Sequence, residues 1–300
     1  MNAQRLKDKI IVVTGATRGA GRGISKALAK EGATIYVTGR STRGGTQTTD
    51  FEDATIERTA EEVNALGGVG IPVRVDHTVE EDVKALFERV QQEQGRLDVL
   101  VNNAWGGYEG IFDVDFSLPF WEQPVWRWDR MFNAGVRSHY LSSRYGAPLM
   151  LPHKQGLIVN TTVLDKEDWL SNIAYDLSKT TINRMAHRMA RELREHNIAA
   201  VALALGWIRT EEMIKRMYRD VDDFNYRDHP ELHVTESVQY GGRAIAALAT
   251  DTSVMDKSGR TMTTGELAHL YGFTDLDGTQ PDWYAAMAEQ AAQKAAQPQM

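Results

Sequence analysis

Tyr175 and Lys179 can do acid–base chemistry together, because they stand four positions apart in the stretch Tyr-Asp-Leu-Ser-Lys. This spacing places both side chains on one face of a helix. A nearby ammonium favours the phenolate and lowers the pKa of a phenol from about 10, which lets the phenol exchange a proton near neutral pH. The same spacing also occurs in exposed helices without function, so its meaning depends on the surrounding elements.

A glycine-rich segment near the start of the chain can bind phosphate. It reads Thr-Gly-Ala-Thr-Arg-Gly-Ala-Gly over residues 14–21, between an apolar run at 10–14 and a helical pattern. At such a junction the backbone turns tightly, and the free N–H groups that begin the helix can bind a pyrophosphate. The alternative is a glycine-rich turn without a ligand. We predict dinucleotide contacts from Gly15, Thr17, Arg18, Gly19, Ala20 and Gly21.

The end of the second predicted strand bears on the choice of dinucleotide. An acidic residue at this position binds the ribose 2′-hydroxyl of NAD. This chain instead has Val-Thr-Gly-Arg ending at Arg40, and Arg18 lies inside the glycine-rich segment. Guanidinium groups can bind a phosphate with two hydrogen bonds. Solvated surface arginines are the alternative, but the two positions favour NADP(H) over NAD(H).

Strands and helices alternate along the chain. Apolar runs predict strands at residues 10–14, 33–38, 69–76, 97–102, 157–163 and 198–205, with helical patterns between them. Strands that are apolar throughout and alternate with helices are typical of a parallel sheet covered on both faces. The sequence therefore predicts an α/β fold, a Rossmann-type doubly wound parallel sheet with helices on both faces in a single domain.

Two segments depart from this alternation. Residues 105–128 are rich in aromatic side chains, and residues 211–234 mix charged with apolar side chains. We expect both to be substrate lids of a domain spanning residues 1–282. Residues 283–300 are rich in Ala and Gln and are predicted to be a helical tail.

Composition excludes several function classes. The 300 residues contain no cysteine, which excludes disulfides, a thiolate nucleophile and cysteine-ligated metals. The net charge of −7 argues against general nucleic-acid binding. The longest nearly unbroken apolar stretch, 198–205, is far short of the about 20 residues of a membrane helix. His229 and His233 lack a clear third ligand, so we predict no metal site. We expect a cytoplasmic protein without a nucleic-acid or membrane partner.

With these motifs in this order, the chain resembles the short-chain dehydrogenases/reductases over residues 8–272. The residues that carry the resemblance are the glycine-rich segment, Asp76, the Asn-Asn-Ala ending at Ala104, the Tyr175/Lys179 pair and residues 206–210. The resemblance implies that Tyr175 is the proton donor and that Lys179 holds the nicotinamide ribose. It also implies cofactor contacts from Asp76 and His77 near the adenine, Asn103 and Ala104 along the adenosine ribose, and Gly206, Ile208 and Thr210 at the carboxamide end.

The departures from the family pattern concern the catalytic residues. Trp105 follows Asn-Asn-Ala where the family has glycine, and the family's serine position falls on Val163. The family's asparagine position falls on Gly135. Thr162 supplies the missing hydroxyl only if the strand end is shifted by one residue, since neighbouring side chains of a strand face opposite ways. We retain Thr162 as a candidate beside Tyr175 and Lys179.

The first hypothesis is an NADP(H)-dependent oxidoreductase that interconverts a ketone or aldehyde with an alcohol, with Tyr175 as proton donor. Its substrate pocket is assigned to Trp105, Val163 and Trp207. The alternatives are a catalytically impaired NADP(H)-binding module, which the missing serine and asparagine favour, and altered chemistry on the same scaffold. The resemblance also implies a homodimer or homotetramer.

Overall fold

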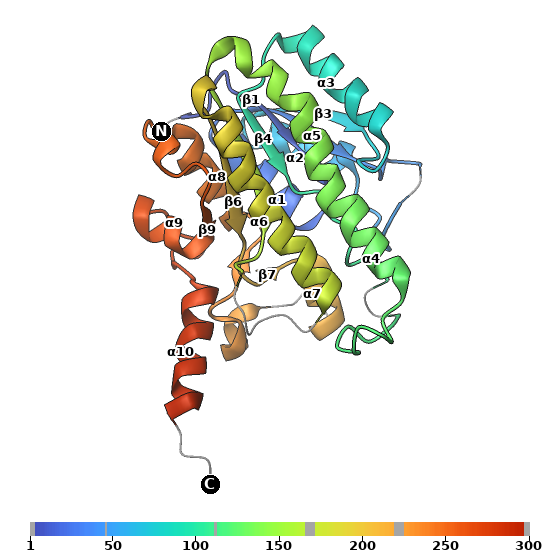
Figure 1. Cartoon of the computed structure of the whole chain (residues 1–300), viewed down its shortest axis with the longest axis vertical. Coiled ribbons are helices and arrows are strands. Elements are labelled where there is room, and N and C mark those ends of the chain that lie inside the picture. The colour runs from blue at the N-terminus through green and yellow to red at the C-terminus, as the bar shows by residue number, and fades with distance from the viewer. Residues whose placement is uncertain (1–3, 46, 111–112, 166–171, 219–224, 297–300) are drawn as a thin grey trace.

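Seven parallel strands form the central sheet in the computed structural model, which describes residues 4–45, 47–110, 113–165, 172–218 and 225–296. The strand order is β3-β2-β1-β4-β5-β6-β9 (Figure 1), so the order reverses between β1 and β4. In such sheets, ligands bind at the carboxyl ends of the strands beside this reversal. The strands are β1 (Ile10–Val13), β2 (Thr34–Gly39), β3 (Val69–Arg74), β4 (Val99–Asn102), β5 (Gly156–Thr162), β6 (Ile198–Ala204) and β9 (Thr261–Thr263).

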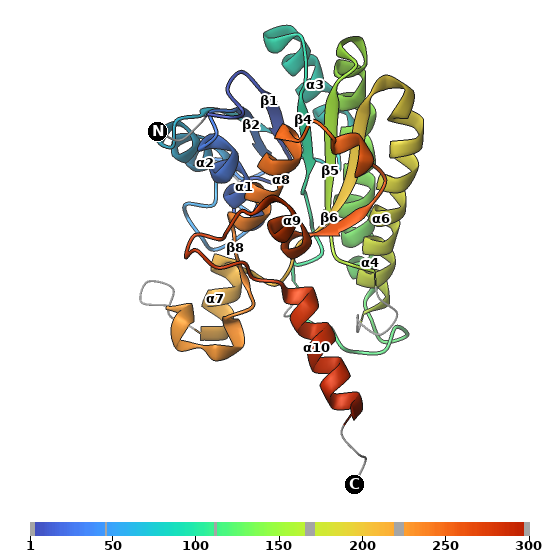
Figure 2. The same ribbon diagram turned by 90° about the vertical axis from the view of Figure 1, so that its left-hand side faces the viewer.

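Helices cover both faces of the sheet (Figure 2). Alternate residues of β1 serve the two sides, because Ile11 and Val13 pack with α1, α2, α8 and α9, whereas Ile10 and Val12 pack with α3, α5 and α6. This two-sided burial explains why the strands are apolar throughout. The helices are α1 (Gly19–Ala29), α2 (Ile56–Ala65), α3 (Glu80–Gln94), α4 (Val125–Met131), α5 (Ser138–Gly146), α6 (Ile173–Leu193), α7 (Glu211–Tyr218), α8 (Tyr240–Thr250), α9 (Thr264–Tyr271) and α10 (Trp283–Ala296).

The predicted fold class is confirmed, and the six predicted strands begin and end within two residues of the observed ones. The seventh strand, β9, is not predicted, because it has three residues and only Met262 among them is apolar. The two-residue pair β7 (Ile208–Arg209) and β8 (Glu236–Ser237) is equally too short to give a pattern.

The helical segment between β4 and β5 has an unusual form. α4 and α5 are joined by a π-helical turn over Phe132–Arg137, without a break in the helical backbone. Turns of this kind are rare and often lie at functional sites. Gly135 lies in the middle of this one.

Three segments lie beyond the carboxyl ends of the strands: the connection from β4 to α4, helix α7, and the start of α10. Tyr284 of α10 reaches the ends of two strands, accepting a hydrogen bond from the Leu164 amide and donating one to the Leu205 carbonyl. The rest of α10 projects away from the body of the molecule (Figure 2). Within the described ranges, none of the helices has both the length and the apolarity needed to cross a bilayer.

Candidate active site

The glycine-rich segment is fixed to the end of β4 by hydrogen bonds. The Thr14 hydroxyl accepts from the amides of Asn103 and Ala104 at 2.8 and 2.9 Å, and the Asn103 side-chain amide donates to the carbonyls of Thr14 and Gly15. Gly15 has a φ of +66°, and a Cβ there would lie 2.8 Å from the Ala104 Cα. Glycine is therefore needed at this position for both its φ and its small size.

Three of the predicted dinucleotide-binding groups, on Gly19, Arg18 and Arg40, are paired with carboxylates of the chain itself. The Gly19 amide, at the start of α1, donates to Glu211 Oε1 at 2.8 Å. The guanidinium of Arg18 lies 3.9 Å from the carboxylate of Glu212. Arg40 forms an ion pair with Glu109. The donor set therefore fits the phosphates of a dinucleotide, because an amide at a helix start and two guanidinium groups already bind anions here.

The two residues expected near the adenine differ in their surroundings. Asp76 accepts hydrogen bonds from the amide and hydroxyl of Thr78, which with the charge of Arg40 lower the pKa of its carboxyl. His77 is buried, and its Nε2 lies 2.8 Å from the hydroxyl of Thr38 on β2. Burial lowers its pKa to about 4, so the ring is neutral at physiological pH. His77 thus faces into the fold.

The first turn of α6 holds Tyr175. Asn172 caps this helix by accepting from the amides of Ala174 and Tyr175. The Tyr175 ring is 8% exposed and packs among Met131, Ala174, Trp105, Phe116 and Val163. Its hydroxyl lies 3.0 Å from the hydroxyl of Tyr108, which the sequence analysis does not assign to the site.

Lys179 is buried one helical turn beyond Tyr175, and its ammonium lies over an aromatic ring. The Nζ is 3.6 Å from the centroid of the Trp105 ring and 5.6 Å from that of Tyr175. Burial lowers the pKa of Lys179 to about 7, and burial together with Tyr108 raises the pKa of Tyr175 well above its usual value. Burial thus shifts the pKa of Tyr175 in the direction opposite to the lowering expected from a nearby ammonium.

Trp105 fits into space left by two glycines. A Cβ on Gly135 would lie 2.5 Å from Cζ3 of the Trp105 ring, and a Cβ on Gly107 would lie 2.6 Å from Cζ2. Such distances are too short for any side chain, so the indole requires glycine at both positions. The indole N–H of Trp105 is buried and has no hydrogen-bond partner among the described residues.

Thr162 and Val163 lie differently with respect to Tyr175. The Thr162 hydroxyl donates to the backbone carbonyl of Lys179 at 3.2 Å and is buried there. Val163 packs against the cluster that contains Tyr175. The side chain at the predicted serine position is thus in the site but apolar, and the Thr162 hydroxyl is engaged with α6.

The segment after β6 places Gly206, Ile208 and Thr210 around a buried carboxylate and the glycine-rich segment. The Gly206 amide donates to Glu236 Oε1 at 2.9 Å, and Ile208 pairs with Glu236 across β7 and β8. Burial raises the pKa of Glu236 to about 8. Thr210 caps the start of α7, and its methyl group is 3.5 Å from where a Cβ of Gly19 would lie.

Trp207 is not brought to Tyr175. Its ring packs edge-on against Trp283 of α10, with centroids 5.0 Å apart, and 42% of the side chain is exposed.

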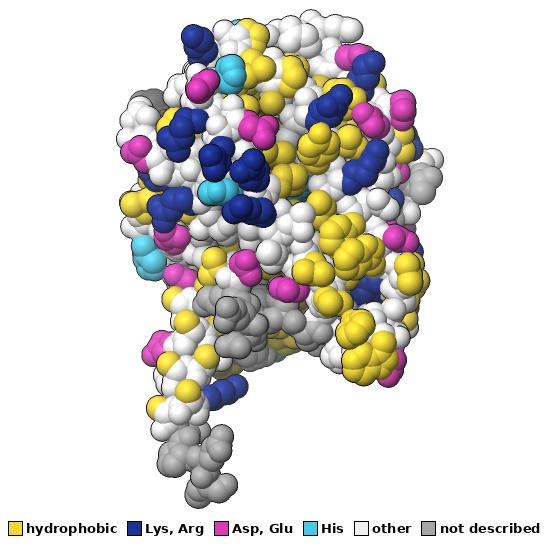
Figure 3. Space-filling view, viewed as in Figure 1, with side chains coloured by type: hydrophobic (Ala, Val, Ile, Leu, Met, Phe, Trp, Pro, Cys, Tyr) yellow, Lys and Arg dark blue, Asp and Glu magenta, His cyan; other side chains and the backbone are white. Residues whose placement is uncertain are grey.

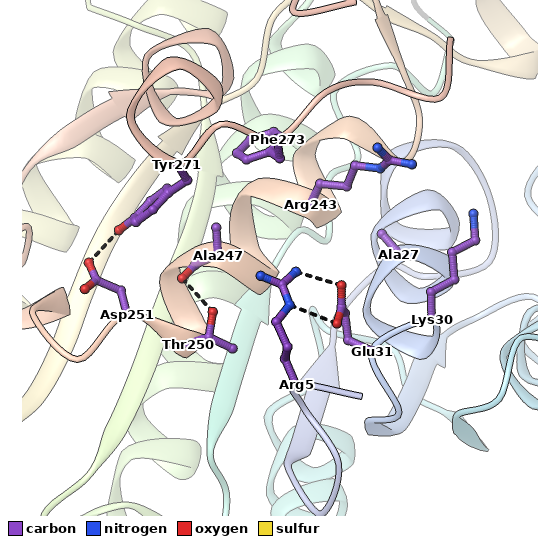
Figure 4. A pocket seen from close by; sticks show the side chains of 10 residues that line it. All are labelled: Arg5, Ala27, Lys30, Glu31, Arg243, Ala247, Thr250, Asp251, Tyr271 and Phe273. Carbon is purple, nitrogen blue, oxygen red and sulfur yellow. Dashed lines mark hydrogen bonds and ion pairs between the residues drawn. The ribbon is translucent and has the colours of Figure 1, made fainter. Parts of the chain in front are cut away.

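A separate cleft of about 530 Å³ lies between α1, α8 and residues 271–273 (Figure 4). Arg5 in this cleft is already bound to Glu31 through two hydrogen bonds, and Arg243 donates to the Thr274 carbonyl. None of the predicted site residues lines it.

Sequence reasoning missed Tyr108, Glu109, Glu211 and Glu236 as parts of the site. Tyr108 lies in an irregular aromatic segment, where no periodicity distinguishes one ring from another. The acidic residues at 211 and 212 begin a helix, which is a common place for carboxylates in any helix. The spacing of these four residues in the sequence therefore does not indicate that they belong to the site.

Known proteins are similar to the chain over most of its length. A family model described as short chain dehydrogenase matches residues 9–220. Dehydrogenase/reductase SDR family member 1 of Mus musculus is 40% identical over 277 residues, covering 91% of this chain and 85% of the relative. A 7alpha-hydroxysteroid dehydrogenase of Clostridium sardiniense is 30% identical, covering 83% of this chain and 89% of the relative.

Solved structures share the fold. A putative dehydrogenase from Xanthomonas campestris has a TM-score of 0.75 at 22% identity, covering 93% of this chain and 98% of the other. A metagenomic short-chain oxidoreductase in complex with NADP has a TM-score of 0.66 at 25% identity, covering 86% and 97%. From the family model and the relatives together, the chain belongs to the short-chain dehydrogenase/reductase family and is an NAD(P)-dependent oxidoreductase.

Proposed function

We propose that the protein interconverts a carbonyl compound and an alcohol with NADP(H), with Tyr175 as the proton donor for reduction. The observation that carries this proposal is the arrangement of α6, which buries the phenol of Tyr175 and the ammonium of Lys179 one turn apart. The apolar and aromatic side chains around Tyr175 also exclude water from the reacting atoms.

The dinucleotide, when bound, supplies or accepts the hydride. Tyr175 gives its proton to the oxygen that becomes the hydroxyl of the alcohol, and its phenolate is then left in an apolar surrounding. Lys179 is the nearby cation that stabilises this phenolate. The amide of Gly19 and the guanidinium groups of Arg18 and Arg40 would hold the phosphates, displacing the carboxylates that they now bind.

Turnover tests the reaction directly. NADPH oxidation is followed by absorbance against carbonyl compounds that range from small polar aldehydes to bulky apolar ketones. We expect turnover that Tyr175→Phe reduces by about 10²–10⁴-fold. Tyr271→Phe is the matched control, because Tyr271 lies on α9 and its hydroxyl donates to Asp251, away from Tyr175. Activity that survives in Tyr175→Phe would contradict the assigned proton donor.

The second candidate is an NADP(H)-binding protein with impaired catalysis. Two observations favour it: Val163 presents an apolar side chain to Tyr175, and the Thr162 hydroxyl is bound to the Lys179 carbonyl. Dinucleotide binding without turnover on any carbonyl compound would support this candidate and overturn the first.

The preference for NADP(H) rests on Arg40 and Arg18, whose present carboxylate partners can be exchanged for a 2′-phosphate. We expect Arg40→Ala to reduce the preference for NADPH over NADH by about tenfold, since hydrogen bonds to charged groups contribute roughly 1.5–3 kcal/mol. Arg43→Ala is the control, because exposed Arg43 pairs with Glu61 on α2. An unchanged preference in Arg40→Ala would contradict the assignment.

The segments 105–128 and 211–234 are the proposed substrate lids. Tyr108 of the first contacts Tyr175, and Glu211 of the second contacts the start of α1. Residues 111–112 and 219–224 of these segments lie outside the described residues.

A second copy of this chain is the proposed partner. Exposed apolar side chains lie on α4, α5 and α6, namely Val125, Trp128, Tyr140, Ile173 and Leu177. Hydrophobic side chains gather on the face that carries these helices (Figure 3). Analytical ultracentrifugation tests this proposal, and Trp128→Glu is expected to shift the protein toward the monomer. A wild-type monomer at micromolar concentration would contradict it.

A further inference from the structure

The ammonium of Lys179 lies where the surrounding side chains offer it no carboxylate. The side chain is 8% exposed, and its Nζ forms neither a hydrogen bond nor an ion pair with another described residue. Nearby, Val163 is apolar and Gly135 has no side chain. A buried charge without a partner destabilises a fold, so Lys179 needs another group that favours its charged form.

The face of the Trp105 ring lies against this ammonium. The Lys179 Nζ is 3.6 Å from the centroid of the Trp105 ring and 5.6 Å from that of the Tyr175 ring. The face of an aromatic ring is negative and attracts a cation within about 6 Å of its centroid, and tryptophan does so most strongly. This attraction increases when the cation is removed from water, as it is here.

Both partners of this contact are held in place. The indole of Trp105 fits beside Gly107 and Gly135, where a Cβ would lie 2.6 and 2.5 Å from ring atoms. The backbone carbonyl of Lys179 accepts a hydrogen bond from the Thr162 hydroxyl at 3.2 Å. The ring therefore has little space in which to move away from the ammonium.

The contact leaves Lys179 able to interact with other groups. An ammonium has three N–H groups, and a ring face occupies only one side of it. The other side can serve the phenolate of Tyr175, whose ring packs edge-on against Trp105 with centroids 5.7 Å apart. The indole thus lies beside both members of the Tyr175/Lys179 pair.

We propose that Trp105 is a positioning residue, whose indole face holds the Lys179 ammonium in its charged form beside Tyr175. In the proposed reduction, Tyr175 gives its proton to the carbonyl oxygen, and the ammonium held by Trp105 stabilises the phenolate that remains. Trp105 itself exchanges no proton and forms no bond with the substrate. This inference rests on the proposed carbonyl–alcohol function and names the residue on which its cation depends.

The charge of Lys179 is sensitive to this contact. Burial lowers the pKa of Lys179 to about 7, so its charged and neutral forms are both populated near neutral pH. The titratable groups on the elements around it are uncharged there, because burial lowers the pKa of His139 on α5 to about 3 and raises the pKa values of Tyr175 and Tyr108. A weaker attraction from the Trp105 ring would favour the neutral amine and lower the pKa of Lys179 further.

The test weakens the attraction while keeping the indole. Tryptophan that carries one, two or four fluorine atoms on its benzo ring is introduced at residue 105 alone, since fluorine withdraws charge from the ring face. We expect kcat for reduction with NADPH at pH 8 to fall stepwise, by about tenfold with four fluorine atoms. At pH 6, where the ammonium is favoured, the fall should be no more than about twofold, so the alkaline limb of the kcat profile moves to lower pH.

The matched control is the same substitution at Trp283, which begins α10. Its ring packs edge-on against Trp207, and no cation of the described residues lies over it. Fluorination of Trp283 should leave the pH profile of kcat unchanged. A profile that also stays in place when Trp105 is fluorinated would overturn the proposal.

A double-substitution cycle separates charge from packing, because fluorine is larger than hydrogen and also disturbs the fit of the indole. Lys179→Met keeps the length of the side chain and removes its charge. In denaturant unfolding at pH 6, four fluorine atoms on Trp105 should destabilise the wild type more than they destabilise Lys179→Met. Equal destabilisation in the two backgrounds would show that the indole only fills space, which overturns the proposal.

Failure of this inference is distinguishable from failure of the proposed function. Wild-type turnover together with equal destabilisation in the cycle overturns the role of Trp105 alone. Absence of wild-type turnover overturns the proposed function, and unequal destabilisation would then still establish that the indole holds the ammonium. NADPH titration of each variant establishes that the dinucleotide site is intact.

Discussion

The two ends of the candidate active site are built in different ways. At the phosphate end, the Gly19 amide and the Arg40 guanidinium already bind the chain's own carboxylates. At the reaction end, Tyr175 lies in a tightly packed aromatic cluster with one polar partner. The first end can accept any well-placed anion, whereas the second depends on the shapes of individual side chains. A single substitution should therefore affect one end without the other.

The largest effect is expected from Tyr175→Phe, which removes the proton donor and keeps the ring. Turnover should fall by about 10²–10⁴-fold. The affinity for NADPH, measured by calorimetry, should change by no more than about threefold, since the phosphate contacts are separate from Tyr175. A parallel loss of turnover and affinity would show that the two ends act as one unit.

Gly135→Ala is expected to disrupt the reaction end through packing alone. The added Cβ would lie 2.5 Å from the Trp105 ring, so the ring must move. We expect a loss of about 1–3 kcal/mol in the free energy of unfolding, as for overpacked cores, and a fall of about 10–100-fold in kcat from misplacement of the ring that covers Lys179. Denaturant unfolding and turnover measure the two effects.

The double variant Trp105→Gly with Gly135→Ala is the control for this packing effect. Without the indole, the Cβ at residue 135 has space, so Gly135→Ala should cost less stability in a Trp105→Gly background than in the wild type. Additive losses from the two substitutions would contradict direct contact as the cause.

Glu211→Gln should sharpen the contrast at the phosphate end. The Glu211 carboxylate accepts from the Gly19 amide and competes with a phosphate for the start of α1. Neutral glutamine should raise NADPH affinity by about two- to fivefold at low salt, since a charge at a helix start contributes about 0.3–1 kcal/mol. The gain should shrink in high salt, and kcat should stay unchanged. Calorimetry at two salt concentrations measures it.

Glu195→Gln is the matched control for Glu211→Gln, because the two substitutions change the net charge equally. Glu195 is exposed and lies beyond the far end of α6. An equal gain in NADPH affinity from both variants would mean that overall charge, and not competition at α1, is responsible.

The smallest effect on function is expected from Glu236→Gln, which acts on stability. Burial raises the pKa of Glu236 to about 8. Between about pH 4.5 and 8 the unfolded state loses this proton while the folded state keeps it, so the wild type becomes less stable as pH rises. Glutamine mimics the protonated form. The Tm advantage of Glu236→Gln should therefore grow over this range, to on the order of 5 °C at pH 8.

Calorimetric Tm values at several pH values provide the measurement, with Glu289→Gln on exposed α10 as the control. A Tm difference that is constant with pH would show that Glu236 is not buried in its protonated form.

The same contrast explains what could be predicted from the sequence. The glycine-rich segment is recognisable because backbone geometry restricts Gly15 to one residue type, and α6 is recognisable because Tyr175 and Lys179 need one fixed spacing. Tyr108 could not be predicted, since its position depends on how an irregular segment folds over the end of β4. The directions in which the pKa values of Tyr175 and Lys179 shift could not be predicted either. Burial is the main cause of both shifts, and the sequence does not show how deeply a side chain is buried.

The fit of Trp105 between Gly107 and Gly135 has a consequence for how such a site can arise. Any side chain at residue 135 collides with the indole in its present position, so a lineage acquires the tryptophan at the lowest cost in stability after this position has become glycine. The reverse direction meets the same obstacle, because a side chain regained at residue 135 displaces the indole. The order of substitutions is thus constrained, and members of this family with a large ring after Asn-Asn-Ala should also have glycine at the position of Gly135.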